Sequence, residues 1–70
     1  MTEVRAEMAA SVWQVCVAVG DVVTAGDTIA ILETMKMEIP VTSPSAGTVV
    51  RVAVNAGDNV LRGDSLADIE

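Results

Sequence analysis

The sequence contains no histidine, tyrosine or phenylalanine, and it has one cysteine, Cys16, and one tryptophan, Trp13. Histidine is the commonest general acid–base group, and a single cysteine forms neither an internal disulfide nor a cysteine-based zinc site. These absences argue against metal-dependent and histidine-based catalysis. One thiol among apolar neighbours is typical of a reducing compartment, so we expect a cytoplasmic protein.

Basic residues are also scarce, with four against ten acidic residues and a formal net charge of −6. This charge repels nucleic-acid phosphates and anionic membrane surfaces, so we expect neither as a partner. No apolar run approaches the roughly 20 residues that cross a bilayer. Three of the four bases are arginines, which leaves Lys36 as the only lysine.

Seventy residues with 51% apolar side chains predict one small folded domain over residues 1–70, with residues 1–5 able to fray. A domain of this size buries only about 60% of its unfolded surface, so a core leaves no room for a deep catalytic cleft. We therefore expect a monomeric binding or carrier module and not an enzyme.

An internal repeat organises the chain. When residues 11–33 are laid over residues 48–70, an offset of 37, ten of the 23 positions are identical. The identical pairs are Val12/Val49, Val15/Val52, Val17/Val54, Gly20/Gly57, Asp21/Asp58, Val23/Val60, Gly26/Gly63, Asp27/Asp64, Ala30/Ala67 and Glu33/Glu70. We therefore predict two copies of one half-domain related by a pseudo-twofold axis.

Each copy has the pattern of β structure, because valine and isoleucine are frequent, short runs alternate and Gly-Asp pairs interrupt them. We predict strands near residues 11–18, 22–24, 28–33, 38–42, 47–54, 59–61 and 65–69. Alternation slips between residues 12 and 15, which predicts a β-bulge there and a second near Val50. We expect an all-β sandwich or flattened barrel whose core lies between the two halves.

The two copies are joined by the segment Glu33-Thr34-Met35-Lys36-Met37-Glu38. One strand ends at its start and the next begins at its end, so we predict a hairpin with Lys36 at the tip. A lysine in a turn is most often a solvated surface residue. Flexible thioethers on both sides, however, suit a surface that a partner grips, and we interpret Lys36 as a recognised amine.

This segment resembles the Met-Lys-Met signature of the biotinyl domains of biotin-dependent carboxylases, and the resemblance covers about residues 6–70. It implies a lipoyl/biotinyl barrel-sandwich of two four-stranded halves, with biotin attached to Lys36 through an amide by a biotin protein ligase. Met35 and Met37 would flank the recognition site, and Glu38 would contribute to ligase recognition. The protein would carry a carboxyl group between a biotin carboxylase and a carboxyltransferase and catalyse nothing itself.

The chain also departs from the family pattern. Glu7 and Ala10 stand where the family often has proline and glycine, and Thr34 stands where alanine is common. The two copies align without a gap, so no insertion forms the protruding thumb of some bacterial carrier subunits. The chain most resembles the stand-alone biotin/lipoyl attachment proteins.

Other candidate residues receive structural interpretations. We expect Cys16 to be an inert strand residue, and Trp13 to be partly buried on the flank of the sandwich in preference to forming a docking surface. The aspartates after the turn glycines show no calcium-loop spacing and are interpreted as turn residues. Glu33 recurs as Glu70, where no hairpin tip is expected, which favours a structural role for it.

Two other functions remain open. Lipoyl domains share the architecture but usually resemble Asp-Lys-Ala around the lysine, whereas this chain has methionine on both sides of Lys36. The third alternative is an interaction module that keeps the barrel and carries no cofactor. The mass of the adduct on the protein from its own cells distinguishes the three.

Overall fold

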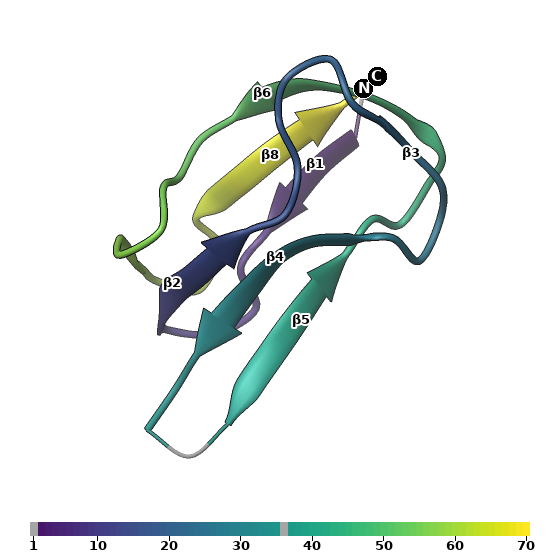
Figure 1. The fold of residues 1–70 in the computed structure, drawn as a ribbon. Helices are drawn as coiled ribbons and strands as arrows, with labels where there is room; N and C mark the ends of the chain where they lie inside the picture. Colours follow the sequence, from purple (N-terminus) through teal and green to yellow (C-terminus); the bar gives the residue numbers. More distant parts are fainter. Residues whose placement is uncertain (1, 36) are drawn as a thin grey trace.

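The structure, a computed structural model, describes residues 2–35 and 37–70. Its strands are β1 (Thr2–Arg5), β2 (Ala10–Val15), β3 (Val22–Val23), β4 (Thr28–Glu33), β5 (Glu38–Thr42), β6 (Gly47–Val52), β7 (Asn59–Val60) and β8 (Ser65–Ile69). They form two antiparallel four-stranded sheets, as Figure 1 shows for most of the strands. The described residues include no helix, and therefore none that could cross a membrane.

The two sheets are equivalent under the sequence repeat. Sheet A has the strand order β1-β8-β6-β3, and sheet B has the order β5-β4-β2-β7. Adding or subtracting 37 converts one order into the other, which confirms the predicted pseudo-twofold relation and the barrel-sandwich fold. Each sheet nevertheless takes two strands from each copy. The core therefore lies between two shared sheets, and the expectation of a core between two separate halves is wrong.

Backbone hydrogen bonds lock the two copies together in equivalent pairs. The amide of Gly20 donates to the carbonyl of Val49 at 2.7 Å, and the amide of Gly57 donates to the carbonyl of Val12 at 2.8 Å. A second pair joins Gly26 to Ser43 at 2.9 Å and Gly63 to Ala6 at 2.8 Å. Each Gly-Asp turn is thus hydrogen-bonded to a segment of the other copy, which explains why neither copy forms a sheet by itself.

The four Gly-Asp turns share one geometry. Each glycine has a positive φ of 91–98°, as the third residue of a type II turn requires. Each following aspartate accepts a hydrogen bond through its carboxylate from the amide three residues earlier, at 2.8–2.9 Å. The bonds join Asp21 to Ala18, Asp27 to Thr24, Asp58 to Asn55 and Asp64 to Leu61. The interpretation of these aspartates as turn residues is confirmed.

The core consists of aliphatic side chains in repeat-related pairs. The buried pairs are Val12/Val49, Val23/Val60, Ile29/Leu66, Ala30/Ala67 and Leu32/Ile69. Both predicted bulges are present, because the register shifts between Val12 and Gln14 in one sheet and between Val49 and Arg51 in the other. Trp13 and Val50 are the extra residues at these two positions.

Strand β1 corrects the expectation for the start of the chain. We predict no strand before residue 11 and allow residues 1–5 to fray, yet Thr2–Arg5 pairs with β8 and buries Val4. The equivalent strand is β5, in which Val41 corresponds to Val4. The strands predicted at 11–18 and 47–54 also end earlier, at Val15 and Val52.

Candidate functional site

The β4–β5 hairpin projects from one end of the sandwich, and the two chain termini lie together at the opposite end (Figure 1). This projection contributes to the elongated shape of the domain, which measures 32 × 18 × 17 Å. The repeat explains the arrangement, because Glu33 ends β4 as Glu70 ends the second copy. The hairpin turn therefore begins at the position in the repeat that corresponds to Glu70.

The hairpin is closed by contacts between Thr34 and Met37. The amide of Thr34 donates to the carbonyl of Met37 at 2.9 Å, and its hydroxyl makes a longer hydrogen bond of 3.4 Å to the same oxygen. The hydroxyl that Thr34 adds in place of the common alanine is thus used within the hairpin. Below this closure the strands pair from Glu33/Glu38 to Thr28/Thr42, which fixes the turn to a rigid ladder.

The sequence-predicted attachment residue, Lys36, lies outside the described residues. Its neighbours in the chain are described, and both methionines are exposed, Met35 completely and Met37 by 59%. The core of the domain does not use these thioethers, and flexible methionine side chains suit a surface that a partner binds. The exposed flanks at Met35 and Met37 leave room for a group joined to a lysine side chain by an amide, and these two residues fit such an attachment.

Two carboxylates face each other at the base of the turn. Glu33 and Glu38 form a cross-strand pair, and both are exposed. Like charges directly opposite each other on two strands are destabilising. Among the described residues, no ion pair neutralises either glutamate, since Arg5 and Arg51 bind Glu3 and Asp68 on sheet A. These contacts give no support to the structural role expected for Glu33. Glu33 and Glu38 have the same exposure and the same place in the hairpin, so both are candidates for recognition by a partner.

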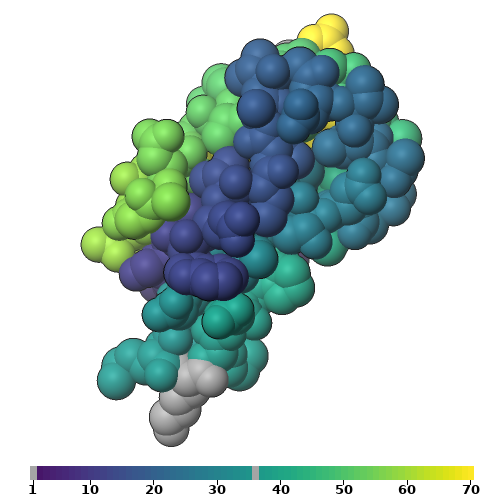
Figure 2. Space-filling model, viewed as in Figure 1, coloured from purple at the N-terminus to yellow at the C-terminus, as the bar shows by residue number. Residues whose placement is uncertain are grey.

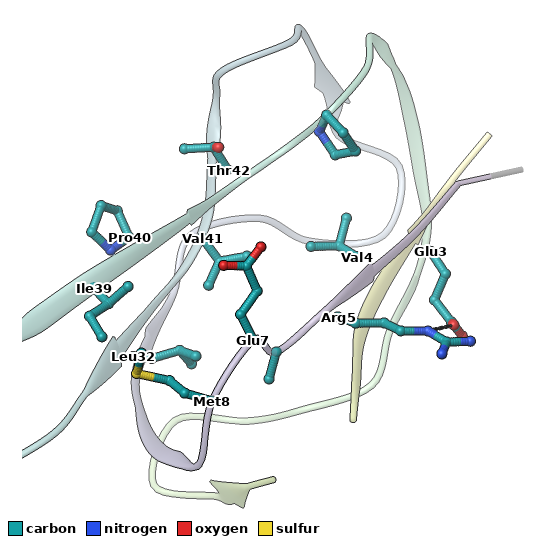
Figure 3. Close-up of a pocket in the computed structure, with 12 residues that line it drawn as sticks. Glu3, Val4, Arg5, Glu7, Met8, Leu32, Ile39, Pro40, Val41 and Thr42 are labelled. Atoms are coloured by element: carbon teal, nitrogen blue, oxygen red, sulfur yellow. Dashed lines mark hydrogen bonds and ion pairs between the residues drawn. The ribbon is translucent and has the colours of Figure 1, made fainter. Parts of the chain in front are cut away.

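A hollow of about 380 Å³ lies at the turn of this hairpin, lined by Glu33, Thr34, Met37 and Glu38. A shallow groove of about 520 Å³ runs along the side of the hairpin, lined by Met35, Thr34, Leu61 and the small residues of 9–11. A further hollow of about 450 Å³ opens between the edge strands β1 and β5, where Val4 and its counterpart Val41 both contribute (Figure 3). Its lining is mainly aliphatic, and its one arginine, Arg5, is paired with Glu3.

Cys16, Trp13 and Arg51 lie outside the β4–β5 hairpin. Cys16 lies just beyond β2 and is exposed, so its predicted place inside a strand is wrong. Trp13 is 49% exposed, in keeping with the partial burial predicted for it. The hydrogen bond to Asp68 and the charge of its carboxylate raise the pKa of the Arg51 guanidinium. No group of three potential metal ligands occurs among residues 2–35 and 37–70.

Comparison with protein families gives one match over nearly the whole chain. Residues 2–69 match the family described as "Biotin-requiring enzyme". A Mycobacterium leprae protein named "Biotinylated protein TB7.3 homolog" is 52% identical over 50 residues, which are 71% of this chain and 70% of that protein. A Bacillus subtilis "Biotin/lipoyl attachment protein" is 45% identical over 49 residues, 70% of this chain and 67% of that protein.

Solved structures share the same fold. The Kluyveromyces lactis urea carboxylase matches 99% of this chain at 36% identity with a TM-score of 0.92. A single-chain, multi-domain long-chain acyl-CoA carboxylase matches 94% at 36% identity with a TM-score of 0.88. In each case the chain corresponds to only 6% of the larger protein. Everything else in those carboxylases lies outside the region of similarity.

Proposed function

Since this chain belongs to the biotin/lipoyl domain family, we propose that it is a biotin carboxyl carrier protein with Lys36 as the attachment residue. One observation carries the proposal: the only lysine of the sequence stands between Met35 and Met37, at the turn of a hairpin that projects from a compact sandwich. The exposure of both methionines and the names of the biotinylated relatives support it.

In this proposal a biotin protein ligase joins biotin to Lys36. The neutral lysine amine attacks the acyl carbon of biotinyl-adenylate, an amide forms and AMP leaves; from the ammonium form, the nitrogen loses two protons, one before the attack and one after it, and keeps the third as the amide N–H. Free lysine has a pKa near 10.4, and only its neutral form is a nucleophile, so the ligase must provide a group that accepts the proton. Acylation also changes the net charge from −6 to −7. Attached biotin supplies the ureido nitrogen that holds a carboxyl group.

Once biotin is attached, the residues of this chain would position it and take no part in the carboxylation or carboxyl-transfer steps. The closure between Thr34 and Met37 and the paired strands below it hold the turn at the end of a stiff ladder. A tether of this kind raises the local concentration of the bound group at each site that it visits. In this proposal the domain is a carrier that serves a carboxylase.

The partners in this proposal are a biotin carboxylase, which loads the carboxyl group, and a carboxyltransferase, which removes it. The similarity to small segments of two carboxylases supports this, because a carrier domain there is part of a much larger chain. ATP is needed to make biotinyl-adenylate, and the proposal therefore places the modification in the cytoplasm.

Lipoyl attachment is the second candidate, because one relative is named a biotin/lipoyl attachment protein. The methionines on both sides of Lys36 favour biotin, since the lipoyl pattern resembles Asp-Lys-Ala. Both candidates use the same lysine and the same hairpin. They differ in which ligase recognises the turn.

The experiment is labelling of the purified protein with a biotin protein ligase, biotin and MgATP, followed by a streptavidin shift. We expect one streptavidin-binding species for the wild type and none for Lys36→Arg, which keeps a cation but loses the acylable amine. A parallel reaction with a lipoate protein ligase and lipoate tests the second candidate. Labelling of Lys36→Arg, or no labelling of the wild type, would contradict the proposal.

A further inference from the structure

The pseudo-twofold repeat provides an internal comparison, because sheets A and B are built from equivalent strands with equivalent buried positions. Across the outer face of sheet A runs a row of three paired residues, Arg51, Asp68 and Glu3. The equivalent row on sheet B is Gln14, Ile31 and Pro40, which are paired in the same way. The residues at these three positions can therefore be charged or uncharged without a change in the fold.

On sheet A the row is an ionic cluster in which the largely buried carboxylate of Asp68 lies between the partly exposed side chains of Arg51 and Glu3. Arg51 donates to the carboxylate of Asp68 at 2.7 Å and to the hydroxyl of Ser65 at 2.9 Å, and it lies 3.9 Å from Glu3. Such a cluster suits a surface that faces water. The bulge beside it carries Val50, which is only 37% exposed.

On sheet B every one of these positions has lost its charge. Ile31 replaces the aspartate, Pro40 replaces the glutamate, and the bulge carries Trp13, the only aromatic residue of the chain. The large side chain of Trp13 is 49% exposed. Tryptophan is among the residues that contribute most to the free energy of binding when a partner covers them. Because the core does not require this difference, we attribute it to a partner that covers sheet B.

The same face leads directly to the hairpin. Ile31 and Glu33 lie on one face of β4, two residues apart, and Pro40 and Glu38 lie on the same face of β5. In Figure 2 residues of β2, in dark blue, lie on the surface directly above the projecting teal hairpin. The apolar row thus continues into the facing pair Glu33 and Glu38, which no described basic residue neutralises.

We propose that the outer face of sheet B, formed by Trp13, Ile31 and Pro40 and bordered by Glu33 and Glu38, is the docking surface for the biotin protein ligase. This inference rests on the proposed function. The matching ligase surface would be an apolar socket bordered by lysine or arginine side chains, which would neutralise the two opposed carboxylates.

The size of an interface favours the ligase over the carboxylase as the occupant. A standard interface buries about 800 Å² on each partner, roughly a fifth of the 4224 Å² surface of this domain, so the turn alone is too small. The ligase acts on the amine of Lys36 before any arm is attached, and it must therefore approach the hairpin and rest against an adjoining face. An enzyme that acts on attached biotin would meet it at the end of the longer arm, farther from sheet B than the amine of Lys36.

The test measures initial rates of biotinylation against carrier concentration with a purified biotin protein ligase, biotin and MgATP. One variant is Trp13→Ser, and its matched control is Val50→Ser at the equivalent bulge of sheet A. A second variant, Gln14→Arg/Ile31→Asp/Pro40→Glu, transplants the ionic row of sheet A, which the same fold already accommodates. Thermal unfolding of each protein verifies that it is folded.

We expect both sheet B variants to raise KM for the carrier by about tenfold or more while kcat changes by less than about twofold, and Val50→Ser to match the wild type. A KM within about twofold of the wild type for the folded sheet B variants would overturn the inference. So would normal biotinylation combined with slower carboxylation by a biotin carboxylase, which would assign the face to that enzyme instead. If the wild type itself is not biotinylated, the proposed function fails and this inference fails with it, an outcome distinct from the other two.

Discussion

The amide of Val12 donates to the carbonyl of Asp58 at 2.7 Å, and the equivalent amide of Val49 donates to Asp21 at 2.8 Å. Each bond joins a core strand of one copy to a Gly-Asp turn of the other. The two copies thus complete each other, and the side chains of the same two valines lie at the centre of the core. This arrangement makes repeat-related positions energetically comparable.

Val12→Ala and Val49→Ala should therefore destabilise the domain to a similar extent. The two side chains are 2% and 0% exposed, and removing buried methyl groups from such sites costs about 1–3 kcal/mol. The measurement is the free energy of unfolding by urea. Val50→Ala, at an exposed bulge position, is the control and should cost less. A loss at one valine with none at the other would contradict the equivalence of the two copies.

Gly47→Ala should be destabilising for a steric reason. A Cβ atom at residue 47 would lie 2.6 Å from the carbonyl oxygen of Glu70 and 2.7 Å from Cγ2 of Ile69. Overpacking of this kind costs about 1–3 kcal/mol, whereas loss of glycine flexibility alone would stabilise the protein. The sign of the change in urea unfolding therefore decides between the two effects. Ala10, the equivalent residue, already carries a Cβ, and Ala10→Gly should cost only about 0.5–1 kcal/mol.

The repeat explains why so much of the fold was predictable from sequence. Identical valines and Gly-Asp pairs at an offset of 37 located six of the eight strands, the turns and both bulges, and β5 was predicted as the strand that follows the hairpin turn. Strand β1 was missed because Thr2–Arg5 and the equivalent residues 39–42 share only one identity, Val4 with Val41. Its pairing with β8 is decided by tertiary contacts that join the two ends of the chain.

The sharing of strands between sheets was not predictable, because a repeat specifies which segments are equivalent and not which sheet each one enters. The candidate site was predictable where it depends on a local signal, the Met-Lys-Met turn between two strands. The apolar face of sheet B was missed because the repeat was compared for its identities. Its signal lies in the differences, at Ile31 against Asp68 and Pro40 against Glu3.

The methionines at the turn should control which ligase acts and should contribute little to stability. Both are exposed, so replacing Met35 by Asp and Met37 by Ala removes little burial. We expect the double variant to unfold near the wild-type urea concentration, to be labelled more slowly by a biotin protein ligase and to gain labelling by a lipoate protein ligase. Undiminished biotinylation without lipoylation would show that the methionines do not discriminate between the cofactors.

The central claim is that Lys36 carries biotin in the cell, and the intact mass of the protein purified from its own cells tests it most directly. We predict a population heavier by one biotin joined through loss of water, with the adduct mapped by peptide sequencing to Lys36 and absent from Lys36→Arg. A protein of unmodified mass, an adduct with the mass of lipoate, or biotin on any other residue would contradict the account.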